Sequence, residues 1–250
     1  MDLGIAGKTA LVMGASRGLG RAVAAALARE GGRVAMASRS RERVAEAADE
    51  IEGETAAFEA DTSDLDRLAK LPEEVAAELG PVEILVTNTG GPPLGGALDH
   101  GRDEWDEAYR SLVLAPRVLA EAVLPGMRER GWGRIVNVGS SSVREPIPHL
   151  TLSTAHRMAA IGFFKTLAGE VAADGVTVNT VATGRFATDR LASNWDSWEE
   201  MQRHAVAGVP AGRLGQPEEY GDLVAFLCSD RAAYLTGAVI PLDGGLLRST

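Results

Sequence analysis

Short apolar segments rich in β-branched residues alternate along the chain with longer segments whose apolar residues recur at helical spacing. The short segments predict strands buried on both faces and the longer ones predict amphipathic helices, so their alternation favours a parallel sheet covered on both sides. The predicted strands are 8–13, 33–38, 56–61, 82–88, 133–140, 176–183 and 238–243. The predicted helices are 20–31, 41–51, 65–79, 103–131, 149–172 after a short opening loop, 188–205 and 216–229.

These elements make a doubly wound, Rossmann-like α/β fold with a parallel sheet of about seven strands. No linker-like change in composition, internal repeat or low-complexity segment interrupts them. We therefore predict a single domain that spans residues 1–250. Ligands of such sheets bind at the carboxyl ends of the strands, and the motifs described below follow strand ends.

Composition favours a globular protein of the cytoplasm. Of the 250 residues 45% are hydrophobic, and the formal net charge is -10. No apolar run reaches the roughly 18 residues of a membrane span, the first residues lack a secretory signal, and no basic cluster predicts a nucleic-acid partner. The single cysteine, Cys228, lies in an apolar run that favours inert packing over a reactive thiol. No motif calls for a metal ion.

The segment VMGASRGLG, residues 12–20, follows the first predicted strand and opens the first predicted helix. Its glycines permit a tight turn and a close approach of the backbone to a pyrophosphate, while the helix N-terminus supplies free N–H groups. A dinucleotide is therefore the expected ligand. The residues of this loop predicted to bind it are Gly14, Ser16, Arg17, Gly18, Leu19 and Gly20.

Ser38 and Arg39 stand at the end of the second strand, where NAD-selective enzymes keep a carboxylate for the ribose 2′-hydroxyl. Because no carboxylate is present to repel a 2′-phosphate, the guanidinium groups of Arg17 and Arg39 are free to bind one. The sequence therefore favours NADP(H), with NAD(H) as the alternative. In a chain this rich in arginine, a solvated Arg39 with no role is the competing interpretation.

Polar residues also follow the third and fourth strands. Asp61, with Thr62 beside it, has two open interpretations: a hydrogen bond to the adenine amino group of the cofactor, or an N-cap for the next helix. Asn88 and Gly90, in the segment TNTGG, lie where the cofactor would pass close to the chain.

Together these motifs resemble the short-chain dehydrogenase/reductase family, and most of all its 3-oxoacyl-carrier-protein-reductase-like members. GASRGLG resembles the glycine loop of that family, GRIVNVGSSS its serine strand, and VNTVATGRFATDR the turn that holds Gly184 and Thr188. GRLGQPEEYGDLVAFLCSDRAAYLTGAVIPLDGG resembles its C-terminal third, so the match runs essentially from end to end. The resemblance implies that Thr188 reaches the nicotinamide carboxamide. It also implies a homotetramer or homodimer with an interface formed by helices around 103–130 and 152–173.

Members of this family reduce a carbonyl with a tyrosine that gives the proton, a lysine, a serine that polarises the carbonyl, and an asparagine. Along the family pattern this sequence keeps the serine as Ser140. The tyrosine becomes Ser153, the lysine Arg157 and the asparagine Ser111, while Thr183 replaces a usual proline. The resemblance therefore predicts a catalytic site with three of its four side chains exchanged.

Ser153 and Arg157 stand at i and i+4, so they are expected to point together from one helix face. An aliphatic hydroxyl is too weak an acid to replace a phenol, and Arg157 stays protonated, so we expect Arg157 to hold the cofactor ribose and Ser153 at most to relay a proton. The proton passed through Ser153 would come from water or from His149, which lies in the loop before the helix and is the first side-chain candidate for the proton donor. His156 and Tyr109 are further candidates, and for each of the three a purely structural role is the alternative. Compositional drift towards arginine is the alternative for Arg157.

Residues 185–212 follow the Thr188 turn, where the family carries its substrate lid. Trp195 and Trp198 either close an apolar pocket for an acyl chain or ring, or pack the lid onto the domain. The substrate is expected to be a small carbonyl or alcohol compound, and the sequence identifies it no further.

Two functions from different classes follow. The first is an NADP(H)-dependent oxidoreductase that transfers hydride between nicotinamide and a carbonyl or alcohol, with atypical catalytic residues. The second is a catalytically weak or inactive NADP(H)-binding homologue that acts as a sensor or a partner subunit. A third interpretation, halohydrin dehalogenase chemistry, is disfavoured because those enzymes keep the tyrosine and abandon the glycine loop, which is the reverse of the pattern here.

Overall fold

The computed structural model describes residues 1–192 and 197–249. Within these residues the chain forms a seven-stranded, wholly parallel sheet in the order β3-β2-β1-β4-β5-β6-β7. This arrangement confirms the predicted doubly wound fold. The strands are β1 (Thr9–Met13), β2 (Arg33–Ser38), β3 (Glu54–Glu59), β4 (Val82–Thr87), β5 (Gly133–Val138), β6 (Val176–Thr183) and β7 (Val239–Leu242).

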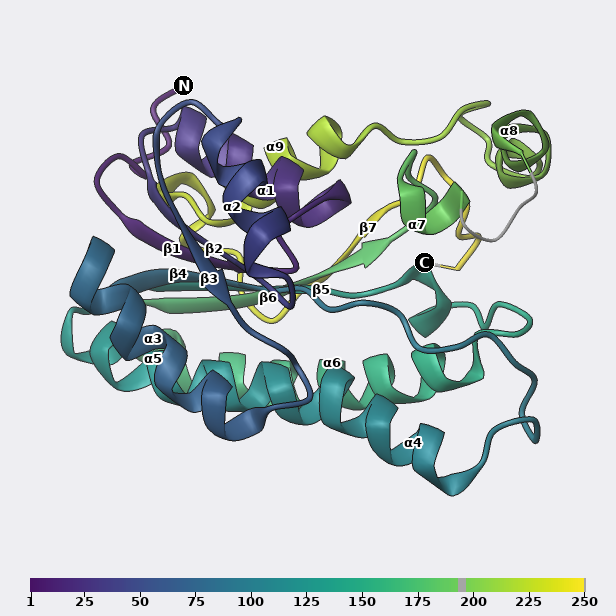
Figure 1. Cartoon of the computed structure of the whole chain (residues 1–250), viewed down its shortest axis with the longest axis horizontal. Coiled ribbons are helices and arrows are strands. Elements are labelled where there is room, and N and C mark those ends of the chain that lie inside the picture. The colour runs from purple at the N-terminus through teal and green to yellow at the C-terminus, as the bar shows by residue number, and fades with distance from the viewer. Residues whose placement is uncertain (193–196, 250) are drawn as a thin grey trace.

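Helices cover both faces of the sheet (Figure 1), with α1, α2 and α9 on one side and α3, α4, α5 and α6 on the other. Successive residues of a strand point to opposite faces, so β1 buries Val12 against α1 and α9 and Leu11 against α3 and α5. The α-helices are α1 (Gly18–Arg29), α2 (Arg41–Asp49), α3 (Leu65–Leu79), α4 (Arg102–Tyr109), α5 (Ala115–Glu129), α6 (Thr151–Val171), α7 (Asp189–Ala192), α8 (Trp198–Val206) and α9 (Pro217–Leu227). Short 3-10 turns are η2 (Ser141–Val143), η3 (Ala172–Asp174) and η4 (Asp230–Ala232).

The helix predicted over 103–131 differs from the prediction, because a π-helical turn, η1 (Arg110–Leu114), separates α4 from α5. Pro116 explains the break, since it has no N–H to donate to the carbonyl four residues earlier. The helix predicted over 188–205 is represented by α7 and α8. No helix in the described ranges is both long enough and apolar enough to cross a bilayer.

Candidate functional site

The glycine loop between β1 and α1 adopts a backbone that side chains would disturb. Gly14 and Gly18 have φ angles of 61° and 56°, in the left-handed region that favours glycine. A Cβ on Gly20 would lie 2.2 Å from the carbonyl oxygen of Gly14, so the helix can pack this closely on the loop only without a side chain there. Arg17 forms the N-cap of α1 but gives no side-chain cap, which leaves the first N–H groups of the helix available to a phosphate. These features fit a bound dinucleotide.

Asn88 faces the glycine loop across the point where the strand order reverses. β1 lies next to β4, so the loops that follow these two strands meet at the carboxyl edge of the sheet. The Asn88 amide donates a long hydrogen bond of 3.5 Å to the Gly14 carbonyl, and a Cβ on Gly14 would approach Asn88 Nδ2 to 2.8 Å. A Cβ on Gly90 would meet nothing within 4 Å, so its backbone is open to a close ligand. The fold therefore brings these predicted cofactor residues together.

The residues expected to select the cofactor differ in whether their side chains already have partners within the protein. Ser38 is buried and its hydroxyl donates to the Ser40 carbonyl at 3.1 Å, whereas Arg39 is exposed and has no partner among the described residues. Arg17 pairs with Asp189 of α7 at 3.7 Å, with both side chains exposed. A 2′-phosphate would therefore compete with Asp189 for Arg17 but would find Arg39 available.

Asp61 does not cap α3, so that interpretation is wrong. The cap is Asp64, whose carboxylate accepts from the Arg67 N–H at 3.0 Å. Asp61 instead accepts from the Ser63 N–H at 2.9 Å within the loop after β3. Both Asp61 and Thr62 remain partly accessible, so adenine recognition stays a prediction.

The turn that leads into α7 lies over the glycine loop. The Thr188 methyl group would be 3.6 Å from a Cβ on Gly18, and the Thr188 hydroxyl accepts from the Leu191 N–H at 3.4 Å. Gly184, at the start of this segment, has no room for a side chain because a Cβ would lie 2.4 Å from Asp243 Cα. Thr188 is thus placed beside the predicted path of the cofactor.

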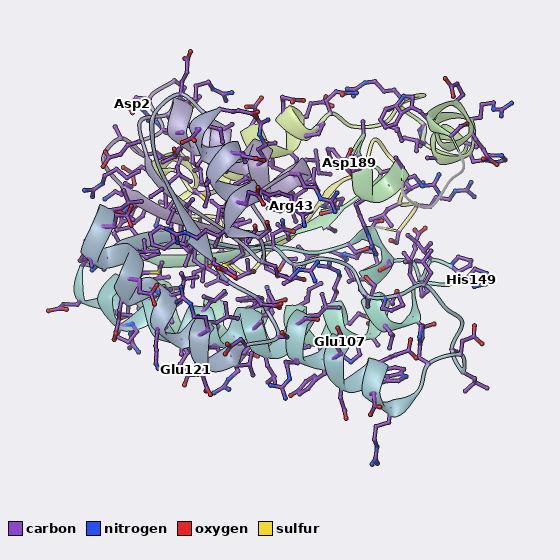
Figure 2. All side chains as sticks on the ribbon, in the orientation of Figure 1. Asp2, Arg43, Glu107, Glu121, His149 and Asp189 are labelled. Carbon is purple, nitrogen blue, oxygen red and sulfur yellow. The ribbon has the colours of Figure 1, made fainter. Side chains whose placement is uncertain are left out.

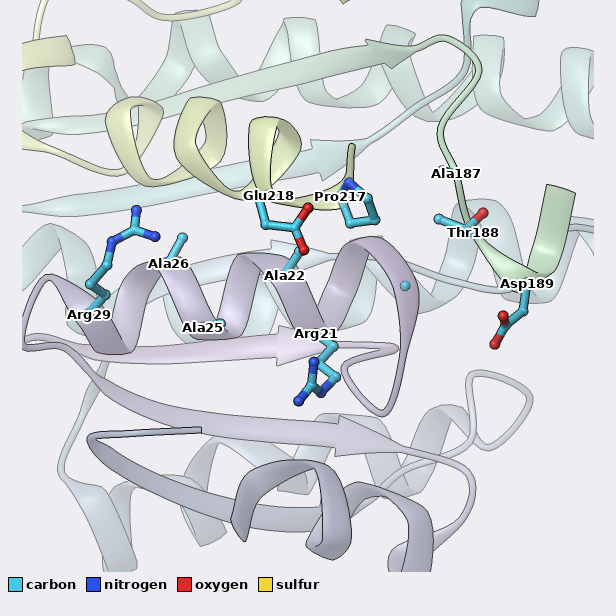
Figure 3. Close-up of a pocket in the computed structure, with 11 residues that line it drawn as sticks. Arg21, Ala22, Ala25, Ala26, Arg29, Ala187, Thr188, Asp189, Pro217 and Glu218 are labelled. Carbon is cyan, nitrogen blue, oxygen red and sulfur yellow. The ribbon is translucent and has the colours of Figure 1, made fainter. Parts of the chain in front are cut away.

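Figure 3 shows a pocket of about 240 Å³ between α1, α9 and this turn. Gly18, Thr188 and Asp189 border the end of the pocket nearest the predicted cofactor site. The rest of the lining comes from outward positions of α1 and the start of α9, including Arg21, Arg29 and Glu218. The pocket therefore adjoins the predicted cofactor site, and its lining includes none of the candidate catalytic residues.

Ser153 and Arg157 point together from α6, as predicted. Arg157 Nε donates to Ser153 Oγ at 3.2 Å, and Arg157 Nη1 donates to the carbonyl of Val138, at the end of β5, at 2.6 Å. The guanidinium therefore fixes the start of α6 to the carboxyl edge of the sheet. Because Ser153 Oγ accepts from Arg157, and no described acceptor takes its own proton, its O–H is left to donate to a ligand.

Burial is the largest influence on Arg157 and lowers its pKa to about 10, against the opposing effect of Tyr220 and with a smaller lowering from the positive charge of Arg190. Arg157 therefore remains protonated at neutral pH. Its role as a fixed positive charge in the site is consistent with the sequence prediction.

Ser140 lies directly after β5, two residues beyond Val138, whose carbonyl accepts the hydrogen bond from Arg157. Its hydroxyl donates to Ser142 Oγ at 3.0 Å and accepts from the Ser142 N–H at 3.2 Å. Ser140 must therefore rotate, or exchange donor roles with Ser142, before it can donate to a substrate carbonyl. Ser142 is fully buried and was not singled out by the sequence.

Ser111 makes no described hydrogen bond to the other candidate residues. It lies in the π-helical turn η1, and its hydroxyl donates to the Glu107 carbonyl one turn earlier at 3.0 Å. The side chain thus satisfies its own helix and makes no described link to Arg157. The π-helical turn itself is a feature that often marks functional positions.

The structure does not favour the predicted proton donors. His149 is exposed, has a φ angle of 63°, and stands at the rim of the molecule (Figure 2). Among the described residues only its carbonyl is engaged, by the Gly95 N–H. His156 is buried, bonds the Leu152 carbonyl at 2.7 Å, and has its ring centroid 5.1 Å from that of Trp105. The structural interpretation therefore holds for His156.

Tyr109 belongs to the same aromatic group, since its ring centroid lies 6.2 Å from that of His156, and its side chain is half-exposed. Its described ring contact on α6 is the one with His156. A structural role explains its position.

A hydrogen-bonded pair that the sequence did not indicate joins β6 to α9, and its tyrosine lies within electrostatic reach of Arg157. The Tyr220 hydroxyl, on α9, is 3.0 Å from Thr183 Oγ1 at the end of β6, and Tyr220 is fully buried. Phe186 packs edge-on against the same ring at 5.3 Å. Burial raises the pKa of Tyr220, so its phenol stays neutral. The two polar residues lie far apart in sequence, which is why pattern alone does not pair them.

Trp198 is half-exposed on α8 and lines a second cavity of about 590 Å³ together with Val206, Leu214 and Arg203. Trp195 lies outside the described residues. Cys228 is fully buried, and burial raises the pKa of its thiol to about 12, which fits the predicted inert packing. In the described ranges no three His, Cys, Asp or Glu side chains are grouped to hold a metal ion.

Comparison with known proteins agrees with the resemblance. The chain matches the family model described as Enoyl-(Acyl carrier protein) reductase over residues 14–247. It is 38% identical over 253 residues to the 3-oxoacyl-[acyl-carrier-protein] reductase FabG of Pseudomonas aeruginosa, covering 99% of this chain and 100% of that protein.

Solved structures similar to the chain include L-sorbose reductase from Gluconobacter frateurii complexed with NADPH and L-sorbose, with a TM-score of 0.94, 30% identity and 100% of both chains covered. Another is YwfH, an NADPH dependent reductase involved in bacilysin biosynthesis, with a TM-score of 0.91, 26% identity and 97% and 99% of the two chains covered. The resemblance is confirmed, and the chain belongs to the short-chain dehydrogenase/reductase family of oxidoreductases.

Proposed function

We propose that the protein is an NADP(H)-dependent oxidoreductase that interconverts a carbonyl and an alcohol with an altered catalytic apparatus. The observation that carries the proposal is the Ser153–Arg157 pair, which is fixed to the end of β5 beside Ser140 and presents an uncommitted hydroxyl proton. The glycine loop and Thr188 lie at the same edge of the sheet and fit a dinucleotide.

In this proposal the bound nicotinamide supplies the hydride. Ser153 donates a hydrogen bond to the substrate oxygen, and Arg157 polarises that hydroxyl and adds positive charge where negative charge develops on the oxygen. Ser140 donates a second hydrogen bond once it has turned from Ser142. Since neither serine is acidic enough to give up its proton outright, the proton comes from water, which is one of the two sources, water or His149, that the sequence left open.

The preference for NADP(H) rests on Arg39 and on relatives. Arg39 is exposed at the end of β2, where no carboxylate opposes a 2′-phosphate. L-sorbose reductase was solved with NADPH, and YwfH is described as NADPH dependent. NAD(H) remains the alternative cofactor.

The second candidate function is a cofactor-binding homologue with little or no catalysis, acting as a sensor or partner subunit. The Ser140–Ser142 hydrogen bond favours it, because the retained family serine is already engaged with a neighbour. The same fold would then bind the cofactor without completing a reaction.

One experiment separates the two. The purified protein is titrated with NADPH by fluorescence, and NADPH oxidation is then followed with a panel of ketones, quinones, 3-oxoacyl esters and free oxo acids. The reductase proposal expects saturable binding and turnover of at least one class. Binding without turnover across the panel would reject it in favour of the sensor or partner role, and absence of NADPH and NADH binding would reject both.

Three further features belong to the proposal. Residues 185–212 act as the substrate lid, with Trp198 on α8 facing a cavity that they border. A homotetramer or homodimer forms through α4, α5 and α6, on which Met158 is an exposed hydrophobic residue. The cytoplasm remains the proposed compartment, on the grounds of composition.

A further inference from the structure

The segment after β7 makes a tight turn of its own. The Asp243 carboxylate accepts from the N–H groups of Gly245 and Leu247 at 2.9 and 2.8 Å. Gly244 and Gly245 have φ angles of 65° and 82°, in the left-handed region that favours glycine, so the two glycines permit the turn. Residues 243–249 are called the strap below.

One side of the strap packs on the proposed lid, residues 185–212. The Gly244 carbonyl accepts from the Ala211 N–H at 3.0 Å. A Cβ on Gly244 would lie 2.9 Å from Val209 Cγ1, so the two backbones meet at close range. The strap is therefore in direct contact with the C-terminal end of the lid.

The other end of the strap is held by Glu145, in the loop that joins β5 to α6. Glu145 Oε1 accepts from the N–H groups of Arg248 and Ser249 at 2.7 and 2.6 Å. The hydrogen bonds from Ser249 and Arg248 are the largest influences on this carboxyl and lower its pKa, so the acceptor is charged at neutral pH. Hydrogen bonds to a charged acceptor are stronger than those between neutral groups.

The strap thus joins the lid to the loop that begins with Ser140. In Figure 1 the yellow segment after β7 passes α7 and runs towards the loop after β5. Gly184, at the start of the turn to Thr188, lies against the base of the strap, because a Cβ there would be 2.4 Å from Asp243 Cα. Lid, strap and β5–α6 loop therefore form a continuous border on this side of the predicted substrate site.

We propose that Glu145 is a positioning residue that holds the strap against the β5–α6 loop, and that the strap so placed restricts the substrate site to small molecules. The inference rests on the proposed oxidoreductase function, in which Ser153 marks the position of the substrate oxygen. Among the described residues, Glu145 forms hydrogen bonds only with the strap. Its effect on the substrate is therefore indirect.

Hydrogen exchange tests the contact itself. Exchange of the Arg248 and Ser249 amides is followed by mass spectrometry of the C-terminal peptide. We expect Glu145→Ala to speed it by about fivefold or more, because each amide loses a hydrogen bond to a charged group. Glu145→Gln keeps an acceptor oxygen and should restore part of the protection. Glu74→Ala is the control, since it removes an exposed carboxylate that pairs with Arg67 at 2.7 Å on α3, and it should leave the strap amides unchanged.

Thiol labelling tests whether the strap limits access, and it requires no turnover. Ser153→Cys places a thiol at the expected substrate position, while the natural Cys228 is fully buried. N-ethylmaleimide and the bulkier fluorescein maleimide share one chemistry, and each rate is normalised to that with glutathione. Adding Glu145→Ala should raise the fluorescein maleimide rate about fivefold or more and keep the N-ethylmaleimide rate within about twofold. Arg248→Pro, which deletes a donor N–H, should act in the same direction, and Glu74→Ala should alter neither rate.

Unchanged exchange in Glu145→Ala would overturn the role of Glu145, and an unchanged ratio of the two labelling rates would overturn the size restriction. Ser140→Cys gives the same measurement if Ser153→Cys fails to fold. Released exchange and faster bulky labelling in a protein that turns over no substrate would support the strap while rejecting the reductase function. Turnover with exchange and labelling independent of Glu145 would do the reverse, so the two proposals fail separately.

Discussion

The cofactor end and the catalytic end of this site share one edge of the sheet but are held in place differently. At the cofactor end, backbone contacts fix residue identity: Gly20 has no space for a side chain against Gly14, and the φ angle of Gly14 is positive. At the catalytic end, side chains hold one another through Arg157, Ser153 and the Val138 carbonyl. A position fixed by backbone packing tolerates almost no exchange, whereas a position fixed by side-chain hydrogen bonds can change when its partners change.

The strongest test of this difference restores the family pair at the catalytic end. Ser153→Tyr with Arg157→Lys supplies a phenolic acid at unaltered spacing, and a positioned general acid contributes about 10²- to 10⁴-fold. We expect turnover to rise by about a hundredfold or more on a substrate found in the panel. Steady-state kinetics measure the change, with each single substitution as its control. No gain would mean that the surroundings of residue 153 are remodelled as well.

Gly20→Ala addresses the cofactor end. The new Cβ would overlap the Gly14 carbonyl, and such overpacking costs about 1–3 kcal/mol. The dissociation constant for NADPH should therefore rise by about 10- to 100-fold, measured by fluorescence titration. Gly169→Ala is the control: its Cβ meets nothing within 4 Å on the exposed face of α6, so α6 gains up to about 1 kcal/mol and binding is unchanged. Unaltered NADPH binding in Gly20→Ala would contradict the view that backbone packing fixes the residues at the cofactor end.

Tyr220→Phe examines the hydrogen-bonded pair of Thr183 and Tyr220. Removing the phenolic hydroxyl leaves Thr183 Oγ1 without that partner. The free energy of unfolding, measured by denaturant titration, should therefore fall by about 0.5–1.5 kcal/mol. NADPH affinity and the pH profile of turnover are expected to stay the same, because the hydroxyl is fully buried and neutral. A loss of turnover larger than the loss of stability explains would assign Tyr220 to the catalytic group.

The smallest effect is expected for His149→Asn. Asparagine tolerates the positive φ angle of this position, so the substitution removes the imidazole with little backbone strain. Because His149 is exposed at the rim, turnover and its pH dependence should not change. A marked fall in turnover at constant stability would restore His149 as the proton donor.

Local patterns were sufficient for the fold and much of the cofactor end. Strand and helix periodicity predicted the sheet and its strands closely, with β3 displaced by two residues, and the glycine spacing predicted the turn before α1. The π-helical turn at Arg110–Leu114 was missed because it depends on a hydrogen-bond pattern that hydrophobic periodicity does not encode. Local pattern also does not decide which acidic residue near a helix start forms the N-cap. Asp61 and Asp64 are both candidates, and the structure uses Asp64.

The sequence by itself determined the parallel α/β fold and the glycine loop, because these follow from periodicity and backbone freedom along the chain. Its resemblance to the family identified Ser153 and Arg157 as standing where other members have Tyr and Lys. Tertiary structure alone decided that Arg157 reaches the Val138 carbonyl, that Thr183 pairs with Tyr220, and that Arg190 extends to Pro92. Each of these contacts joins segments from different parts of the chain. Their energies depend on distance, burial and local charge, which exist only once the sheet has brought the strand ends together.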